Sequence, residues 1–343
     1  MRRLYFLSCL WFICACAAPQ APVHKQLYAM GTLIDVSFYD SSDEQINQAM
    51  QAITDDFTYM SVAWNPWKAG TIARVNKLLP LQASFSSSAS AAQLIAAAKP
   101  LAEQSENLFN PAMGQLIKLW RFNVADNISP PPPSDVAIKA LINDMPTLAD
   151  VEVKGLVLKG KHQNLLLDFG GFAKGYGVDK VIEHLQDLGV KNVIVNAGGD
   201  LRAIGSKGKK PWVVGIRHPR ADGIIASVNI DQDESVFTSG DYERYYDYED
   251  RRYHHILDPR SGHPAQGVTS VTVIHKNAAT ADAAATALFV AGVKDWHRIA
   301  MKMGIRYVML IDDKGEVHMN PAMKARIKWQ QSTQKIHLSP ELG

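Results

Sequence analysis

Two residues one helical turn apart, Asp282 and Thr286, have the chemistry of a magnesium site. They lie in an alanine-rich segment, residues 281–292, that predicts a helix, and a spacing of four places both side chains on one face. A carboxylate and a hydroxyl oxygen are hard ligands of the kind that Mg²⁺ prefers. The same pattern also fits a helix start, with Thr280 as the cap and Asp282 beside the helix dipole, and taken alone this structural interpretation is favoured.

A glycine-rich turn at residues 168–177 is the second candidate. Residues 165–168 predict a strand, Gly170 and Gly171 a turn, and residues 172–188 a helix. Glycines let the backbone approach a ligand, a helix N-terminus favours an anion, and Lys174 adds a charge that suits phosphate. The spacing matches neither the Rossmann nor the P-loop fingerprint, which excludes both interpretations. In isolation, a tight turn with a solvated lysine is the simpler explanation.

A second strand that ends in glycines, residues 195–200, closes on Asp200, where an Asx turn is the simpler explanation. Two adjacent histidines, His254 and His255, precede the rigid pair Asp258-Pro259. In an extended segment they point to opposite sides, so that one of them could face a cleft and act as a general base. The alternative, favoured in isolation, is a histidine pair on the surface.

The elements that must position these residues predict an α+β fold: one large domain with mixed or antiparallel sheets and interspersed helices. Helices are expected at residues 43–59, 88–105, 134–144 and 281–292, and a turn followed by a helix at 107–122. Strands are expected at residues 26–39, 193–195, 212–217, 227–230, 268–274 and 307–311, and a proline-rich loop at 130–133. Because strands and helices do not alternate regularly, a doubly wound sheet is disfavoured.

Composition excludes several classes of function. The 343 residues are 47% hydrophobic and 20% charged, which is typical of a globular protein and argues against wholesale disorder. With 36 Lys and Arg against 34 Asp and Glu, there is no excess of positive charge for nucleic-acid binding. The cysteines, Cys9, Cys14 and Cys16, all precede the body of the chain, which rules out a disulfide scaffold or a thiolate metal site there.

The first residues have the layout of a bacterial export signal. Arg2 and Arg3 precede an apolar run at 4–13, and small residues follow. Residues 13–16 resemble a lipobox, so we expect a lipoprotein signal at 1–18 with Cys16 as the acylated residue; soluble export is the alternative. Residues 19–25 would be a tether, 26–320 the domain and 321–343 a C-terminal tail. The expected location is the periplasmic face of the inner membrane, through a lipid anchor.

Taken together and in order, the motifs resemble the ApbE family of FAD:protein FMN transferases. The resemblance covers about residues 26–315, and the matching elements are 30–32, the segment around Asn76, 109–111, 168–179, 197–200, 239–244, 255–264 and 281–286. Each element is weak alone, but eight in order are specific.

The resemblance implies a function. Members of the family use Mg²⁺, split FAD, join FMN through its phosphate to a Thr or Ser hydroxyl of a target flavoprotein, and release AMP. The targets are exported or membrane proteins, such as subunits of electron-transport complexes. Two alternatives are an FAD pyrophosphatase, in which water replaces the hydroxyl, and an exported lipoprotein that only binds flavin.

The resemblance also implies roles for particular residues. His255 would be catalytic, and the metal would be bound by Asp282, Thr286 and the carbonyl of Gly171. The flavin or adenine would be contacted by Met30, Trp64, Leu108, Phe109, Asn110, Asp168, Lys174 and Ile256. Two departures stand out: an apparent insertion makes Trp67 a rival of Trp64, and Asn110 replaces the Asp common in the family.

Overall fold

The computed structural model describes residues 21–124, 129–230, 232–332 and 335–343. The expected signal at 1–18, with Cys16, lies outside the described residues. Within the described part of the chain, no helix combines the length and the hydrophobicity that crossing a bilayer requires.

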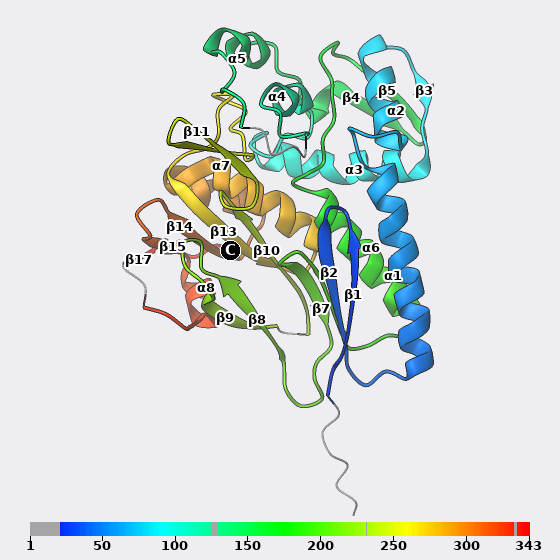
Figure 1. The fold of residues 1–343 in the computed structure, drawn as a ribbon, viewed down its shortest axis with the longest axis vertical. Coiled ribbons are helices and arrows are strands. Elements are labelled where there is room, and N and C mark those ends of the chain that lie inside the picture. The colour runs from blue at the N-terminus through cyan, green and yellow to red at the C-terminus, as the bar shows by residue number, and fades with distance from the viewer. Residues whose placement is uncertain (1–20, 125–128, 231, 333–334) are drawn as a thin grey trace, which may run out of the picture.

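A nine-stranded sheet forms the centre of the molecule (Figure 1). Its order is β1 (Val23–Ala29), β2 (Thr32–Phe38), β6 (Val193–Ala197), β7 (Asp200–Ile204), β10 (Asp233–Gly240), β13 (Val268–His275), β14 (Tyr307–Asp312), β15 (Val317–Met319) and β17 (Ile336–Leu338). Neighbours pair antiparallel except β15 and β17, which run parallel.

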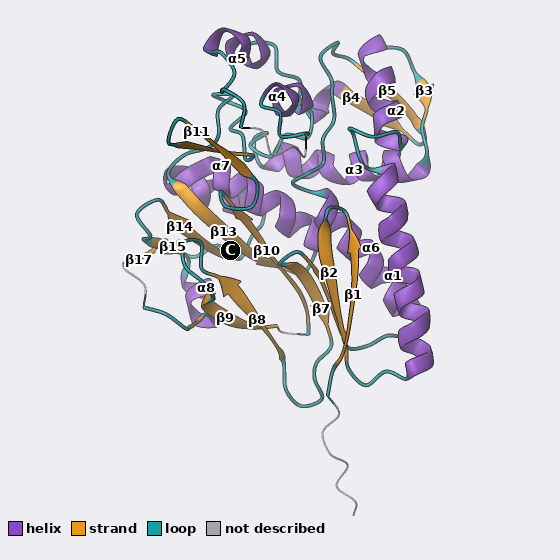
Figure 2. Ribbon diagram, in the orientation of Figure 1, coloured by secondary structure: helices purple, strands orange, loops and turns teal. Residues whose placement is uncertain are grey.

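Helices cover one face of this sheet and a small sheet covers the other (Figure 2). The helical side is built from α1 (Asp43–Ala63), α6 (Ala173–Asp187) and α7 (Ala278–Lys302). The small sheet has the order β16 (Lys328–Trp329), β9 (Ile224–Ile230) and β8 (Trp212–Arg217). Successive side chains on a strand point to opposite faces of the sheet and therefore pack into two cores. On β10, Phe237 packs in the core between the sheet and the helices, and Val236 packs in the core between the sheet and the small sheet.

The remaining elements form a lobe at one end of the molecule and a hairpin near it (Figure 1). They are α2 (Thr71–Leu78), α3 (Ala89–Gln104), α4 (Gly114–Leu119), α5 (Asp135–Ile142), the short helices Leu79–Leu81 and Leu148–Asp150, the strands β3 (Phe85–Ser86), β4 (Val151–Lys154) and β5 (Val157–Gly160), and the hairpin β11 (Tyr245–Tyr248) and β12 (Arg251–His254). The α+β fold expected from the sequence is confirmed.

Two expected strands differ in the structure. The expected strand at 26–39 is a hairpin, because Met30 and Gly31 adopt φ values of 51° and 77° and reverse the chain between β1 and β2. Residues 165–168 form no regular strand; Leu166 makes an isolated bridge with Met113. The buried side chain of Asn76 takes the place of a neighbouring strand there, since it bonds both the N–H and the C=O of Leu167.

The domain is longer at both ends than the sequence predicts. Residues 321–343, expected as a tail, contain α8 (Pro321–Arg326), β16 and β17, and the two strands pair with β9 and β15. Val23, within the expected tether at 19–25, begins β1. The helix expected at 281–292 extends from Ala278 to Lys302, with a break at Gly292, where φ is 73°.

Candidate functional site

The helices α6 and α7 bring the predicted metal ligands together. Asp282 lies on α7 and accepts a hydrogen bond through Oδ2 from the backbone N–H of Gly175 on α6, at 2.9 Å. A Cβ placed on Gly171 would lie 2.8 Å from Thr286 Oγ1, so the backbone of Gly171 touches this side chain. Asp282, Thr286 and Gly171 are therefore neighbours in space, although more than a hundred residues separate the glycine bend from α7.

The oxygen-rich surroundings of Asp282 fit a divalent cation. Burial, together with the nearby carboxylate of Asp200, raises the pKa of Asp282 to about 7, while Lys174 acts in the opposite direction. A bound cation would stabilise the charged form of this carboxyl, and carboxylate, hydroxyl and carbonyl oxygens are the donors that Mg²⁺ takes. Ser239 Oγ lies 3.3 Å from Thr286 Oγ1 and adds a second hydroxyl. The ligand roles themselves stay a prediction.

Lys174 is held in this region by an ion pair with Asp200. The Lys174 ammonium donates to Asp200 Oδ2, and Asp200 Oδ1 accepts from the N–H of Thr238 at 2.9 Å. Burial alone would lower the pKa of Lys174, but the carboxylates of Asp200 and Asp282 outweigh it and raise this pKa above its usual value. The lysine is therefore a fixed cation beside Asp282. Asp200, explained from sequence as a turn residue, orients it.

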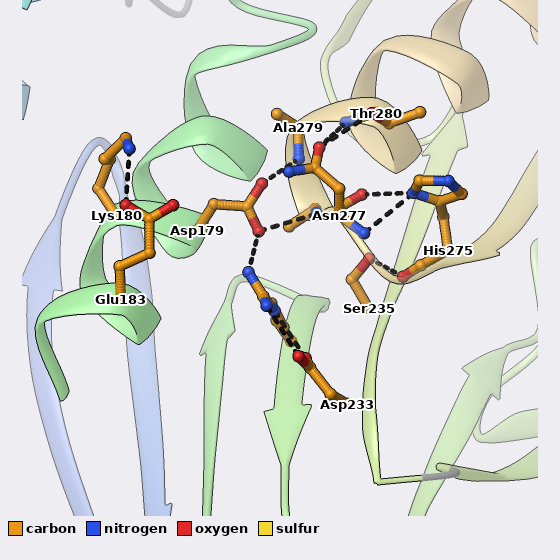
Figure 3. A network of polar contacts seen from close by, with 11 residues as sticks. Asp179, Lys180, Glu183, Asp233, Ser235, His275, Asn277, Ala279 and Thr280 are labelled. Carbon is orange, nitrogen blue, oxygen red and sulfur yellow. Dashed lines mark hydrogen bonds and ion pairs between the residues drawn. The ribbon is translucent and has the colours of Figure 1, made fainter. Parts of the chain in front are cut away.

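An ion-pair network fixes the start of α7 (Figure 3). Asp179, on α6, accepts from the N–H groups of Ala278 and Ala279, each at 2.9 Å. Arg202 donates to Asp179 at 2.6 Å and makes a two-pronged contact with Asp233. Because α6 both caps α7 and donates to Asp282, the position of Asp282 depends on this network. Sequence reasoning did not assign Asp179 a role.

The two histidines have different environments. The buried His254 donates through Nε2 to the carbonyl of Ala265 at 2.7 Å, and its Nδ1 accepts from the N–H of Ile256. His255 is partly exposed, and its Nδ1 lies 3.1 Å from the carbonyl oxygen of Arg244. A carbonyl only accepts, so this Nδ1 carries the proton and Nε2 is the unprotonated nitrogen of the neutral ring.

The neutral form of His255 is favoured further by its surroundings. Although the residue is partly exposed, packing around the ring removes much of its hydration and, together with the positive charge of Arg244, lowers the pKa of His255 well below its usual value. A neutral imidazole with a fixed Nδ1–H is the form that accepts a proton at Nε2. The position and tautomer of His255 therefore suit a general base, whereas His254 is buried and its hydrogen bonds stabilise the core.

Arg244 connects His255 to the glycine bend. A Cβ on Gly170 would lie 3.7 Å from Arg244 Nη2. Burial lowers the pKa of Arg244, while the carboxylate of Asp168 acts in the opposite direction. Gly170 is therefore near the Arg244 guanidinium, and Gly171 packs against Thr286. The motif at 239–244 was the sequence signal for Arg244, but no role was assigned to it.

Contacts with neighbouring side chains distinguish Trp67, which bonds Asp168, from its rival Trp64. Asp168 Oδ1 accepts from the N–H of Gly170 at 2.7 Å, and its Oδ2 accepts from Nε1 of Trp67 at 2.9 Å. Trp64 is buried, donates to Ser90 Oγ, and packs against Tyr176 with ring centroids 5.5 Å apart. Trp67 thus lies beside the bend, and Trp64 belongs to the core.

Most of the other residues predicted to contact the flavin or adenine are buried. Leu108, Phe109, Asn110 and Ile256 are each at most 5% exposed. Asn110 Nδ2 donates to the carbonyl of Pro146, and its Oδ1 accepts from the N–H of Ala112. Both halves of this amide therefore stabilise the loop. Met30, at the hairpin turn, is partly buried and donates its backbone N–H to Ser61 Oγ.

The fold and the site define an α+β protein in which oxygen ligands, a fixed lysine and a neutral histidine converge on one glycine bend. The sequence model of the ApbE family matches residues 30–309. The chain belongs to the ApbE family, which confirms the resemblance inferred from its motifs.

The chain is also similar to individual proteins that are named FAD:protein FMN transferases. The FAD:protein FMN transferase of Rhodobacter capsulatus is 36% identical over 311 residues, which are 91% of this chain and 59% of that protein. The FAD:protein FMN transferase of Vibrio cholerae is 28% identical, over 90% of this chain and 93% of the relative. The chain thus spans about three fifths of the length of the Rhodobacter protein.

Solved structures share the fold. The ApbE protein of Thermotoga maritima superposes with a TM-score of 0.80 at 30% identity, covering 91% of this chain and all of that one. The flavinyl transferase ApbE of Pseudomonas stutzeri, in its apo form, gives 0.76 at 26% identity over 89% and 96%.

Proposed function

We propose that this protein is an FAD:protein FMN transferase that uses Mg²⁺ and transfers FMN from FAD to a Thr or Ser hydroxyl of a target flavoprotein. The observation that carries the proposal is the Gly170–Gly171 bend: Gly171 packs against Thr286, Gly170 is near the guanidinium of Arg244, and the carbonyl of the same arginine holds His255. Membership of the family, and relatives named for this activity, support the same proposal.

The reaction is a phosphoryl transfer, in which positioning and charge neutralisation matter most. The target hydroxyl oxygen forms a bond to the phosphorus nearest riboflavin, and the bond from this phosphorus to the bridging oxygen breaks. AMP leaves with the bridging oxygen. His255 accepts the hydroxyl proton at Nε2, which its Nδ1 contact with Arg244 leaves as the acceptor.

Asp282, Thr286 and Gly171 would hold the Mg²⁺ ion, which supplies charge neutralisation at the diphosphate when bound. Lys174 acts beside them: an ammonium has three N–H donors, so its bond to Asp200 leaves donors for phosphate oxygens. Trp67 and Asp168 are our candidates for contact with the dinucleotide, because they lie together beside the bend. Buried residues near them, including Phe109 and Asn110, help to hold the surrounding loops in position.

The proposed location is the periplasmic face of the inner membrane, where acylated Cys16 would anchor the domain and the target would be an exported or membrane flavoprotein subunit. The charged, apolar and small-residue layout of the first residues supports this proposal. Incorporation of labelled palmitate into the wild-type protein, and its loss in Cys16→Ser, would be the expected result. Label retained by Cys16→Ser would contradict acylation at this residue.

The deciding experiment mixes the purified protein with FAD, Mg²⁺ and a candidate acceptor and measures the intact mass of the acceptor. We expect a gain equal to FMN and an equal amount of AMP. Free FMN formed without an acceptor would instead support the FAD pyrophosphatase. Intact FAD after incubation would support a protein that only binds flavin.

A further inference from the structure

Two imidazoles and two carboxylates cluster at the edge of the central sheet, where β15 and β17 lie at the opposite side of the molecule from β1 (Figure 1). His318 is on β15, His337 is on β17, and Glu316 directly precedes β15. One possible ligand atom from each of these three residues lies within 4.8 Å of the other two. The proposed transfer reaction makes no use of this cluster.

The strand pairing fixes the two imidazoles side by side. His318 and His337 are direct partners in the parallel pair of β15 and β17. Because paired residues on neighbouring strands point to the same face, their rings stack, with centroids 4.5 Å apart and planes 7° from parallel. Glu316 is two residues before His318, a spacing that returns to the same face of an extended chain.

The carboxylates complete the cluster and hold it in place. His337 Nε2 lies 2.5 Å from Glu316 Oε2, and His318 Nε2 lies 3.0 Å from Asp312 Oδ2. Asp312 is itself fixed, since its Oδ1 accepts from the backbone N–H groups of Lys314 and Glu316. The side chains of His318 and Asp312 are 12% and 9% exposed, against 35% and 29% for His337 and Glu316. The cluster is thus shielded on one side and open on the other.

We propose that His318, His337 and Glu316 form a second metal site, one for a transition-metal ion such as Zn²⁺, with Asp312 orienting the His318 ring. Two imidazole nitrogens with a carboxylate are a donor set for zinc and its neighbours in the periodic table, in contrast to the oxygen donors around Asp282. A carboxylate on a metal-binding histidine is the usual outer partner of such sites. A bound ion would join β17, close to the C-terminus, to the rest of the sheet.

The test is a titration of the full-length protein with Co²⁺ and Zn²⁺, in an excess of Mg²⁺ and without a histidine tag. We expect wild type to bind one more ion than His318→Gln/His337→Gln, with a visible Co²⁺ absorption that the double variant lacks. Zn²⁺ should raise the melting temperature of wild type but not of the double variant. Because both proteins retain Asp282 and the N-terminal cysteines, the difference between them reports on this cluster alone.

His162→Gln is the matched control, because His162 also pairs with a carboxylate, Asp144, at 3.0 Å. It should bind metal as wild type does. Should circular dichroism show that the double variant is unfolded, Glu316→Gln takes its place, since it retains both imidazoles and should bind Co²⁺ at least tenfold more weakly. Equal stoichiometry and affinity in wild type and the folded variant would overturn the proposal and leave two structural contacts, His337 with Glu316 at β17 and His318 with Asp312 between β15 and the end of β14.

Discussion

Asp282 on α7 is hydrogen-bonded to the backbone N–H of Gly175 on α6, at 2.9 Å, so the candidate metal ligand is positioned by a neighbouring helix rather than by its own. The contact requires close packing. A Cβ on Gly175 would lie 2.3 Å from the carbonyl oxygen of Ala278 and 2.8 Å from Asp282 Cβ. Glycine at this position is therefore required by the close packing of α6 against α7.

Asp282→Asn should abolish transfer without unfolding the protein. The amide is nearly isosteric but lacks the charge that binds Mg²⁺, so we expect transfer to fall by more than about 100-fold, beyond the effect typical of losing an outer partner of a metal. Because burial raises the pKa of Asp282, a neutral side chain should keep or increase the melting temperature measured without metal. Normal transfer at ordinary Mg²⁺ concentrations would remove Asp282 from the site.

Gly175→Ala should destabilise the fold by about 1–3 kcal/mol, the usual cost of an added methyl in a packed core. It should also raise the Mg²⁺ concentration needed for half-maximal transfer, because the methyl would displace Asp282. Urea denaturation and a Mg²⁺ titration of the transfer rate measure both effects. Gly177→Ala is the control in the same helix, since its methyl would meet the flexible Met60 side chain at 3.1 Å. Equal losses in the two variants would contradict the special role of Gly175.

His255→Gln should retain FAD binding and lose transfer by about 10²–10⁴-fold, the usual contribution of a general base. FAD fluorescence and the mass gain of the acceptor measure the two properties separately. With Mg²⁺ saturating, the wild-type rate should persist below pH 6.5, because the lowered pKa keeps His255 neutral there. His254→Gln should instead lower the melting temperature, since it disturbs a buried contact with Ala265. An unchanged rate in folded His255→Gln would exclude this base.

Trp67→Phe should weaken FAD binding, because it removes the indole N–H that orients Asp168 beside the bend. We expect a loss of about 0.5–1.5 kcal/mol, the net value of one hydrogen bond. Trp64→Phe is the matched change in the core: it should lower stability by a similar amount and leave FAD affinity near wild type. Fluorescence titration with FAD and thermal denaturation distinguish the two, and the reverse pattern would restore Trp64 as the flavin contact.

Asp179→Asn should raise the Mg²⁺ concentration needed for half-maximal transfer more than it lowers the maximal rate. The change removes the charge between Arg202 and the N-terminus of α7, and breaking a buried pair costs about 3–5 kcal/mol. A Mg²⁺ titration at saturating FAD, on protein shown to be folded, measures the effect. A lower maximal rate with an unchanged Mg²⁺ requirement would show that Asp179 does not act through Asp282.

The sequence by itself determined the α+β class, most helices and the groups able to do chemistry. Asp282 and Thr286 share a helix face because their spacing is local, and glycines at 170 and 171 predict a turn because glycine destabilises the interior of a helix or strand. Hydrophobic periodicity is a local property, so helices such as α1 and α6 were recognised from it.

Only the tertiary structure decided which partners these groups meet. Two adjacent histidines look alike in sequence, yet contacts with Ala265 and Arg244 make one a core residue and the other a candidate base. The contact of Trp67 with Asp168, the ion pair of Lys174 with Asp200, and the pairing of His318 with His337 join residues that are distant in the chain. Such contacts depend on how helices and strands pack, and no local pattern encodes that packing.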